Sequence, residues 1–220
     1  MYAQVIQGMV APGYATDYEG YIDQLLTFLE QQPGFQGGWS SNSVGQPSKY
    51  AFTTLWENAA AARAVRVHPA FRSFVEANRA IRSITTMTQP TEAYEPLILE
   101  MGTGDARFVV NLAITIDPLQ TVAFEQLAKT RVSLLQKVGR GLVSHVVSRY
   151  LGSPGRYGVV LAYLTREDAE ATLQNPELQR SLQEHPISEF GGSQTAEFFE
   201  VLKAVVPRPA AASASAAPRR

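Results

Sequence analysis

The sequence predicts an α+β protein made of two tandem copies of one βαββαβ unit. The first observation is an internal repeat, in which glycine, proline and tyrosine recur at one constant offset in sequence position. The matching segments are Gly34-Phe35 with Gly141-Leu142, Gly45–Tyr50 with Gly152–Tyr157, and His68–Phe71 with Asn175–Leu178. The second observation is that both halves alternate between strand-like and helix-like hydrophobic periods in the same order. We conclude that the chain carries a duplication.

The first copy begins with a β-rich segment that ends at Pro12-Gly13. Thr16 and Glu19 form a capping-box pattern, which predicts a helix start where two side chains satisfy free backbone amides. Apolar residues at helical spacing follow until Pro33-Gly34 ends the helix. The four strands predicted in this copy are Tyr2–Val10, Phe35–Val44, Tyr50–Trp56 and Tyr94–Met101.

The second helical region of the first copy follows Asn58, a residue type that caps helices well. His68-Pro69 interrupts this region, because a residue before proline is pushed out of the helical conformation. We expect the segment Ser83–Thr91 to be the loop region between the repeats.

The second copy follows the same plan. Asp117-Pro118 predicts a capped helix start with proline at the first helical position, and Thr165 predicts another cap. Asn175-Pro176 breaks the last helical region as His68-Pro69 does in the first copy. The strands predicted in this copy are Arg107–Ile116, Leu142–Leu151, Tyr157–Leu164 and Gln194–Lys203.

A βαββαβ unit is the ferredoxin-like motif, and its size sets the predicted domain boundaries. We expect one ferredoxin-like repeat over residues 1–103 and a second over residues 104–206. Residues 207–220 are mainly Pro, Ala and Ser, so we predict a disordered tail.

Composition excludes several classes of function. The net charge is −1 with no basic stripe, which argues against a nucleic-acid partner. No apolar stretch is long enough to span a membrane, and no signal peptide is visible, so we expect a cytoplasmic protein without a membrane partner. The chain has no cysteine, and its three histidines lack the spacing of metal ligands. We therefore expect no metal and no cofactor.

Three motifs carry a resemblance to a known family. They are Pro33-Gly34-Phe35 after the first helix, a strand that begins at Tyr50 and ends in Trp56-Glu57, and His68-Pro69-Ala70-Phe71. Together they resemble the antibiotic biosynthesis monooxygenase family of the dimeric α/β-barrel superfamily, whose shorter members pair their sheets into a closed barrel. The resemblance implies that this chain closes the barrel by itself, as a monomeric pseudo-dimer or as a homodimer of such units.

The family resemblance also implies an activity. It suggests a cofactor-independent monooxygenase that acts on a small aromatic, quinol or polyketide-type molecule. Two family histidines are replaced by Val65 and Ala70, and Gln4 stands near the position of an asparagine used by haem-degrading relatives. Haem degradation is therefore disfavoured, and a non-catalytic barrel, either binding a small molecule or purely structural, is the alternative. A thermal-shift screen with aromatic ligands would separate these alternatives.

In the first copy, four residues are candidates for a site. His68 could act as a catalytic acid or base, the common role of histidine in proton transfer. Trp56 could form a pocket wall, with Asn42 and Tyr50 binding substrate. The competing interpretations are that Trp56 packs in the core and that His68 is a helix cap or surface residue.

In the second copy, strand alternation places His145, Val147 and Arg149 on one face of the strand Leu142–Leu151. His145 could be catalytic, and Arg149 with Tyr163 could bind a phenolate or carboxylate substrate. The competing interpretation is a solvated face. Which of the two halves holds the site is left open by the sequence.

Overall fold

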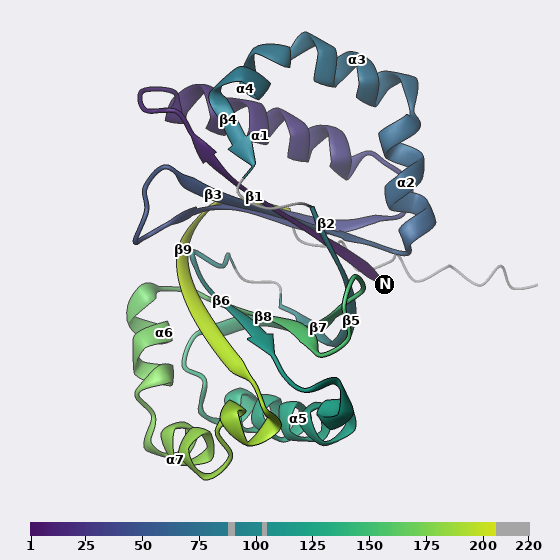
Figure 1. The fold of residues 1–220 in the computed structure, drawn as a ribbon. Coiled ribbons are helices and arrows are strands. Elements are labelled where there is room, and N and C mark those ends of the chain that lie inside the picture. The colour runs from purple at the N-terminus through teal and green to yellow at the C-terminus, as the bar shows by residue number, and fades with distance from the viewer. Residues whose placement is uncertain (88–90, 103–104, 206–220) are drawn as a thin grey trace, which may run out of the picture.

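The computed structural model describes residues 1–87, 91–102 and 105–205 (Figure 1). The first repeat contains β1 (Tyr2–Val10), α1 (Ala15–Glu30), β2 (Phe35–Ser43), β3 (Lys49–Trp56), α2 (Ala59–Val67), α3 (Pro69–Ala77), α4 (Arg79–Ile84), β4 (Thr85–Met87) and β5 (Glu92–Met101). The second contains β6 (Phe108–Thr115), the 3-10 turn η1 (Pro118–Gln120), α5 (Thr121–Val138), β7 (Leu142–Tyr150), β8 (Arg156–Tyr163), α6 (Arg166–Leu173), α7 (Pro176–Glu184), the 3-10 turn η2 (Ile187–Phe190) and β9 (Ser193–Val205).

Among the described residues, eight antiparallel strands close into one barrel. Their order is β3-β2-β9-β6-β8-β7-β5-β1, and β1 pairs again with β3 to complete the ring, while β4 adds to the edge of β1. The strands β5 and β9 pass from one repeat to the other, since β5 pairs with β1 and β7, and β9 pairs with β6 and β2. The predicted fold, two ferredoxin-like repeats that form an intramolecular pseudo-dimeric barrel, is confirmed.

The strand order gives the barrel a pseudo-two-fold axis along its length. A step of four places around the ring maps β3 onto β8, β2 onto β7, β9 onto β5 and β6 onto β1. The constant offset seen in the sequence relates the starts of β2, β3, α2 and α3 to those of β7, β8, α6 and α7. The first strand departs from it by one position, because Ala3 lies opposite Leu55 whereas Val109 lies opposite Ala162. The sequence separation between structural counterparts is therefore one residue smaller for β1 and β6 than for the later elements.

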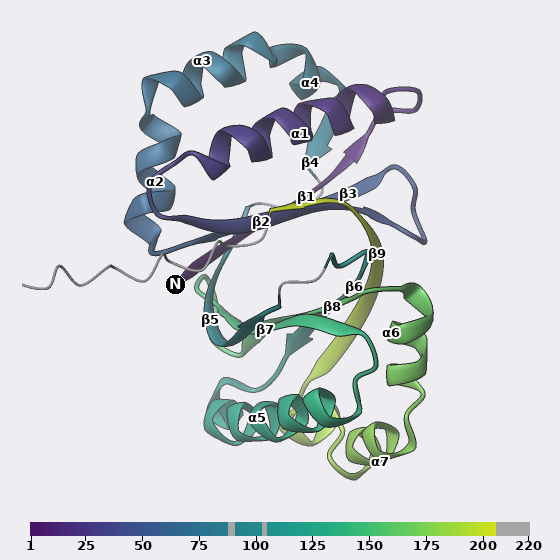
Figure 2. The ribbon, with the colours of Figure 1, turned by 180° about the vertical axis from the view of Figure 1, so that it is seen from behind.

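The helices cover the outer faces of the barrel, α1 to α4 on one side and α5 to α7 on the other (Figure 2). Alternate residues of β3 explain why this face is buried, since Tyr50, Phe52 and Trp56 all pack into the apolar cluster beneath α1 and α2. Phe124 and Tyr163 belong to the equivalent cluster of the second repeat. Two apolar cores thus lie outside the barrel, between the sheet and its helices.

A hydrogen bond repeated in both halves ties each first helix to its sheet. The Tyr50 hydroxyl donates to Glu19 at 3.1 Å, and the Tyr157 hydroxyl donates to Glu125 at 3.0 Å. The two tyrosines are separated by the constant offset and the two glutamates by one position less, as in β1 and β6, so the contact obeys the internal symmetry. We interpret this pair of contacts as part of the scaffold.

Most of the predicted helix caps are present. Asn58, Thr165 and Asn175 accept hydrogen bonds from backbone amides at the starts of α2, α6 and α7. Asp117 accepts one from the Leu119 amide and caps the turn η1 before α5. These caps satisfy amides that have no partner inside the helix.

The predicted capping box of the first helix is wrong. The helix α1 begins at Ala15, one residue before Thr16, and no side chain caps it. The physical reason is that Glu19 turns toward the sheet and accepts the Tyr50 hydroxyl instead of reaching back along the helix.

The predicted loop region Ser83–Thr91 is partly wrong, because residues 85–87 form the short strand β4 against β1. Residues 88–90 of that segment lie outside the described residues, as does the predicted tail over 207–220. The predicted boundary between residues 103 and 104 also falls outside them. Within the described residues, no helix is long and apolar enough to cross a membrane.

Candidate functional site

The described residues enclose two chambers inside the barrel, which follow one another along its axis. The apolar chamber has a volume of about 600 Å³ and lies where β6 and β7 begin and β9 ends. The polar chamber has a volume of about 250 Å³ and lies where β3 and β8 begin. Trp39, Val146 and Val160 line both chambers and therefore form the partition between them.

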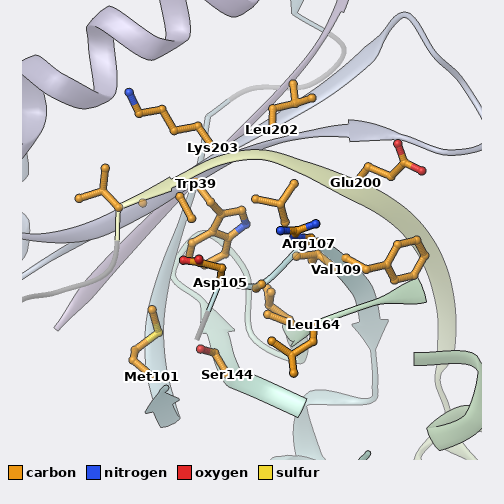
Figure 3. Close-up of a pocket in the computed structure, with 18 of the residues that line it drawn as sticks. Trp39, Met101, Asp105, Arg107, Val109, Ser144, Leu164, Glu200, Leu202 and Lys203 are labelled. Carbon is orange, nitrogen blue, oxygen red and sulfur yellow. The ribbon is translucent and has the colours of Figure 1, made fainter. Parts of the chain in front are cut away.

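The apolar chamber is walled by hydrophobic side chains from several strands (Figure 3). The apolar residues that line it include Trp39, Met101, Val109, Val146, Val160, Ala162 and Val201. Their side chains point inward because residues two apart on a strand share a face. A ligand pocket of a few hundred Å³ with mainly apolar walls is typical of small-molecule sites.

Trp39 is the largest side chain of this wall and comes from β2. It is 8% exposed, and no described residue accepts a hydrogen bond from its indole N–H. The preceding Gly38 permits the close approach of β3, because a Cβ there would lie 2.7 Å from the Thr53 carbonyl oxygen. The counterpart of Trp39 in the second repeat is Val146, so the partition is asymmetric.

Polar groups gather at the mouth of the apolar chamber. Ser144 Oγ accepts a hydrogen bond from the Gly102 amide at 3.1 Å, which leaves the hydroxyl proton available to a ligand. The exposed side chains of Asp105 and Arg107 have no ion-pair partner among the described residues. Lys203, by contrast, turns away from the chamber and pairs with Asp23 of α1 (Figure 3).

The polar chamber is built around two ion pairs that each join one repeat to the other. Arg156 Nη2 lies 2.9 Å from Glu92 Oε1, and Lys49 pairs with Glu197. Lys49 and Arg156 begin the equivalent strands β3 and β8, and the two glutamates lie opposite Val5 and Asn111, which are structural counterparts. The pairs are therefore related by the pseudo-two-fold axis, and we interpret them as a clamp between the repeats.

Tyr94 completes the clamp on one side. Its hydroxyl donates to Glu92 Oε2 at 2.5 Å, and the Arg156 guanidinium lies 4.5 Å from the ring centre of Tyr150. Burial, together with the hydrogen bond to Glu92, raises the pKa of Tyr94 above its ordinary value, so this hydroxyl stays protonated. The polar chamber thus carries balanced charges that are already paired.

The candidates from the first repeat do not line either chamber. Trp56 is 3% exposed and lies on the helix side of β3, where its indole N–H donates to Thr54 Oγ1 at 3.0 Å. Tyr50 shares that face, and burial next to Glu19 raises its pKa to about 12. Asn42 donates to the carbonyl oxygens of Pro47 and Lys49 and so stabilises the β2–β3 turn.

His68 is exposed and acts as a helix cap. Its Nδ1 accepts a hydrogen bond from the Ala70 amide at 3.2 Å at the start of α3. Proline at the next position forces the extended backbone that this cap needs. The structure therefore favours the structural interpretation of His68, and the residue lies in neither chamber.

The candidates from the second repeat also lie outside the barrel cavity. His145 is 3% exposed with its Nε2 3.9 Å from Glu100, and burial lowers its pKa. Arg149 contacts Glu95 and Glu125, and Tyr163 is fully buried beneath the helices. Neither His145 nor Arg149 lines the two barrel chambers, because their face of β7 packs toward α5.

Sequence reasoning missed the residues that line the cavity, among them Trp39, Ser144 and Val146. Alternation correctly separated the two faces of β7, but it could not say which face looks into the barrel. Both faces of this strand carry buried residues, since helices cover one face and the barrel encloses the other. Glycine before tryptophan in β2 was the available signal, because Gly37-Gly38 is unusual in a strand interior.

No cluster of three or more metal-binding side chains occurs within the part of the chain that the structure describes. The smaller space between the sheet and the helices of the second repeat is about 90 Å³ and is lined almost wholly by aliphatic side chains. The barrel interior is accordingly the candidate site for a small molecule.

The fold and the cavity together define a class of protein, an α/β barrel made of two fused ferredoxin-like units around an axial cavity. Residues 1–77 match the family model described as antibiotic biosynthesis monooxygenase, which confirms the resemblance drawn from the sequence. The match covers the first repeat from β1 to the end of α3. A comparison with curated proteins gave no match.

Solved structures share the whole architecture. A candidate monooxygenase from Fusobacterium nucleatum aligns with a TM-score of 0.77 at 13% identity, over 92% of this chain and 93% of that one. A candidate monooxygenase from Lactobacillus acidophilus aligns with a TM-score of 0.75 at 11% identity, over 93% and 96%. An anthrone oxidase-like protein aligns with a TM-score of 0.62 at 14% identity, over 93% and 92%. At these identities the likeness shows the fold alone.

Proposed function

We propose that this protein binds a small aromatic molecule of the quinol or polyketide type in the apolar chamber of its barrel. The observation that carries the proposal is the chamber itself, about 600 Å³ in volume with mainly apolar walls and the indole of Trp39 on one side. The space between the sheet and the helices of the second repeat, about 90 Å³, is much smaller than this chamber.

The polar groups of the chamber suit oxygen atoms on such a ligand. The Trp39 N–H has no acceptor among the described residues, and the Ser144 hydroxyl has a proton to donate. A ring that packs against the Trp39 indole could place a carbonyl or phenolic oxygen near these donors. Arg107 at the mouth offers a further donor, with no ion-pair partner among the described residues.

The test is a binding measurement with 1-naphthol, anthrone and hydroquinone. We expect a dose-dependent rise in Tm and quenching of Trp39 fluorescence, since a ligand that binds only the native state stabilises it. The variant Trp39→Val carries the side chain found at the counterpart position, Val146, and should lose both the rise in Tm and the fluorescence quenching. The control Trp56→Phe changes the only other tryptophan, which lies outside the barrel, and should keep the Tm response. If none of the ligands raises the Tm or quenches the fluorescence of the wild-type protein, the proposal is overturned.

The second candidate function is cofactor-independent oxygenation of the bound molecule, and the family match over residues 1–77 favours it. In such a reaction a quinol-type substrate loses a proton and passes electrons to O2, so the protein must supply a base and hold the anion. Asp105 is a carboxylate at the mouth of the apolar chamber without an ion-pair partner among the described residues, and we assign it to this role.

Oxygen consumption with a ligand that binds would test this candidate. We expect Asp105→Asn to slow consumption at least about 100-fold, the lower end of what a general base typically contributes. His68→Ala and His145→Ala should leave the rate unchanged, because neither residue lies on the chamber. If a ligand binds but no oxygen is consumed, the protein is a binding barrel and the second candidate fails.

A further part of the proposal concerns assembly. Because β5 and β9 complete the barrel within one chain, we propose a monomer in solution. Light scattering coupled to size-exclusion chromatography should give a mass near 24.1 kDa, and twice that mass would contradict the proposal.

A further inference from the structure

We infer that the polar chamber is a second subsite of the barrel, which takes a neutral hydroxyl group at the far end of the bound aromatic molecule, with Asn111 as the residue that recognises it. This inference rests on the proposed function, because it assumes that the aromatic part of the ligand occupies the apolar chamber. It adds a requirement on the ligand, namely a second oxygen on the side remote from the mouth.

The two chambers adjoin at one wall of the barrel. Val160 lines both of them, and Asn111 lies directly opposite Val160 in the pairing of β6 with β8. Val109 lines the apolar chamber two residues earlier on the same strand, a rise of about 7 Å. We therefore place the distal end of a molecule of two fused rings beside Asn111, next to Val160.

The charges of the polar chamber favour a neutral group over an ion. Each cation there already has a carboxylate partner, Arg156 with Glu92 and Lys49 with Glu197. An ionic ligand group would have to break a pair that also clamps the two repeats together. The polar groups left over are uncharged, and they include Gln7, Thr53 and Thr195.

Asn111 is one of the positions at which the two repeats differ in this chamber. Its counterpart in β1 is Val5, which lies opposite Thr53 as Asn111 lies opposite Val160. Its Oδ1 is sealed from solvent and has no hydrogen-bond partner among the described residues. An unpaired amide oxygen costs stability, so a valine here, as in the first repeat, would suit an empty barrel better.

A hydroxyl is the ligand group that matches a side-chain amide best. It both donates and accepts, so it can pair with Asn111 in either orientation of the amide. A carboxylate only accepts and an ammonium only donates. The geometry thus points to a diol whose two oxygens lie at opposite ends of a fused aromatic ring system.

The test compares two ligands that differ only in the distal hydroxyl, 2-naphthol and 2,6-dihydroxynaphthalene, by isothermal titration calorimetry. We expect the diol to bind the wild-type protein about fivefold more tightly, the effect of one net hydrogen bond. In Asn111→Val the two affinities should become equal, and the Tm of the unliganded protein should rise. The variant Asn111→Ala is a second comparison, because it removes the amide without placing the branched methyl groups of valine in the chamber wall.

The matched control is Val5→Ala, which alters the equivalent position of the first repeat without changing a polar group. It should keep the preference of the wild-type protein for the diol. If both ligands bind and Asn111→Val keeps that preference, the inference about the polar chamber is overturned while the proposed function stands. If neither naphthol binds the wild-type protein, the proposed function fails first and the inference falls with it.

Discussion

The ion pair between Glu92 and Arg156 offers a direct test of how the two repeats are held together. We predict that Glu92→Gln destabilises the whole chain, although it removes only a charge. Glutamine keeps an oxygen that can accept the Tyr94 hydroxyl, but it leaves Arg156 without its carboxylate. The pair joins a strand of the first repeat to a strand of the second, so the loss should weaken the contact between them.

The magnitude follows from how far the pair is buried. The Glu92 side chain is 11% exposed and that of Arg156 is 42% exposed. Breaking a fully buried pair costs about 3–5 kcal/mol, and an exposed pair contributes at most about 1 kcal/mol. Because water screens the exposed guanidinium, we expect a loss of about 2 kcal/mol, or about 4–8 °C in Tm for a chain of this size.

The assay is urea unfolding followed by two signals. Both tryptophans lie in the first repeat, so their fluorescence reports that repeat, whereas far-ultraviolet circular dichroism reports both. We expect the two transitions to coincide in the wild-type protein. The control Lys137→Gln removes an exposed pair with Glu177 within the second repeat and should leave the midpoint unchanged.

The refuting result is a Glu92→Gln variant whose midpoint equals that of the wild type. A double-mutant cycle with Arg156→Gln then locates the error. A coupling near zero between the two positions would show that the pair contributes nothing to the join between the repeats. The same cycle on Lys49 and Glu197 should return a coupling of similar size, because the two pairs are related by the internal symmetry.

Further predictions concern single residues. Burial lowers the pKa of His145 below its ordinary value of 6.5, so the native state binds fewer protons than the unfolded one, and stability falls as the pH drops below about 6.5. His145→Gln should flatten the fall in Tm between pH 7 and pH 5, and an unchanged slope would contradict this reasoning. Asn175→Ala removes two capping hydrogen bonds from α7 and should cost about 1 kcal/mol in urea unfolding, whereas Asn175→Asp should retain most of that stability.

The order of elements could be predicted from sequence because it depends on local signals. Proline and glycine ended the elements, asparagine and threonine capped the helices, and hydrophobic period separated strand from helix. The prediction of the first helix start was wrong. The local pattern assigned the Glu19 carboxylate to helix capping, but in the structure this carboxylate accepts a hydrogen bond from Tyr50, which is distant in sequence.

The candidate site was predicted less well, and the reason is the architecture. In a barrel surrounded by helices, both faces of a strand can be buried. Burial therefore does not distinguish the face that lines the barrel interior from the face that packs against the helices. His145 and Trp56 lie among packed side chains outside the barrel, while Trp39 and Val146 lie inside it. A shift of one residue along a strand moves a side chain from the inner face of the barrel to the face that packs against the helices.

The sequence by itself determined the duplication, the βαββαβ order and the constant offset between the copies, because each repeat contains its own turn and cap signals. The tertiary structure decided which face of each strand looks into the barrel and which departures from symmetry matter. Two such departures are Trp39, whose counterpart is Val146, and Asn111, whose counterpart is Val5. They can be recognised only in the folded barrel, where the pseudo-two-fold axis brings both copies to the same cavity. The physical reason is that strand pairing between distant segments sets the direction of every side chain, and no local pattern encodes it.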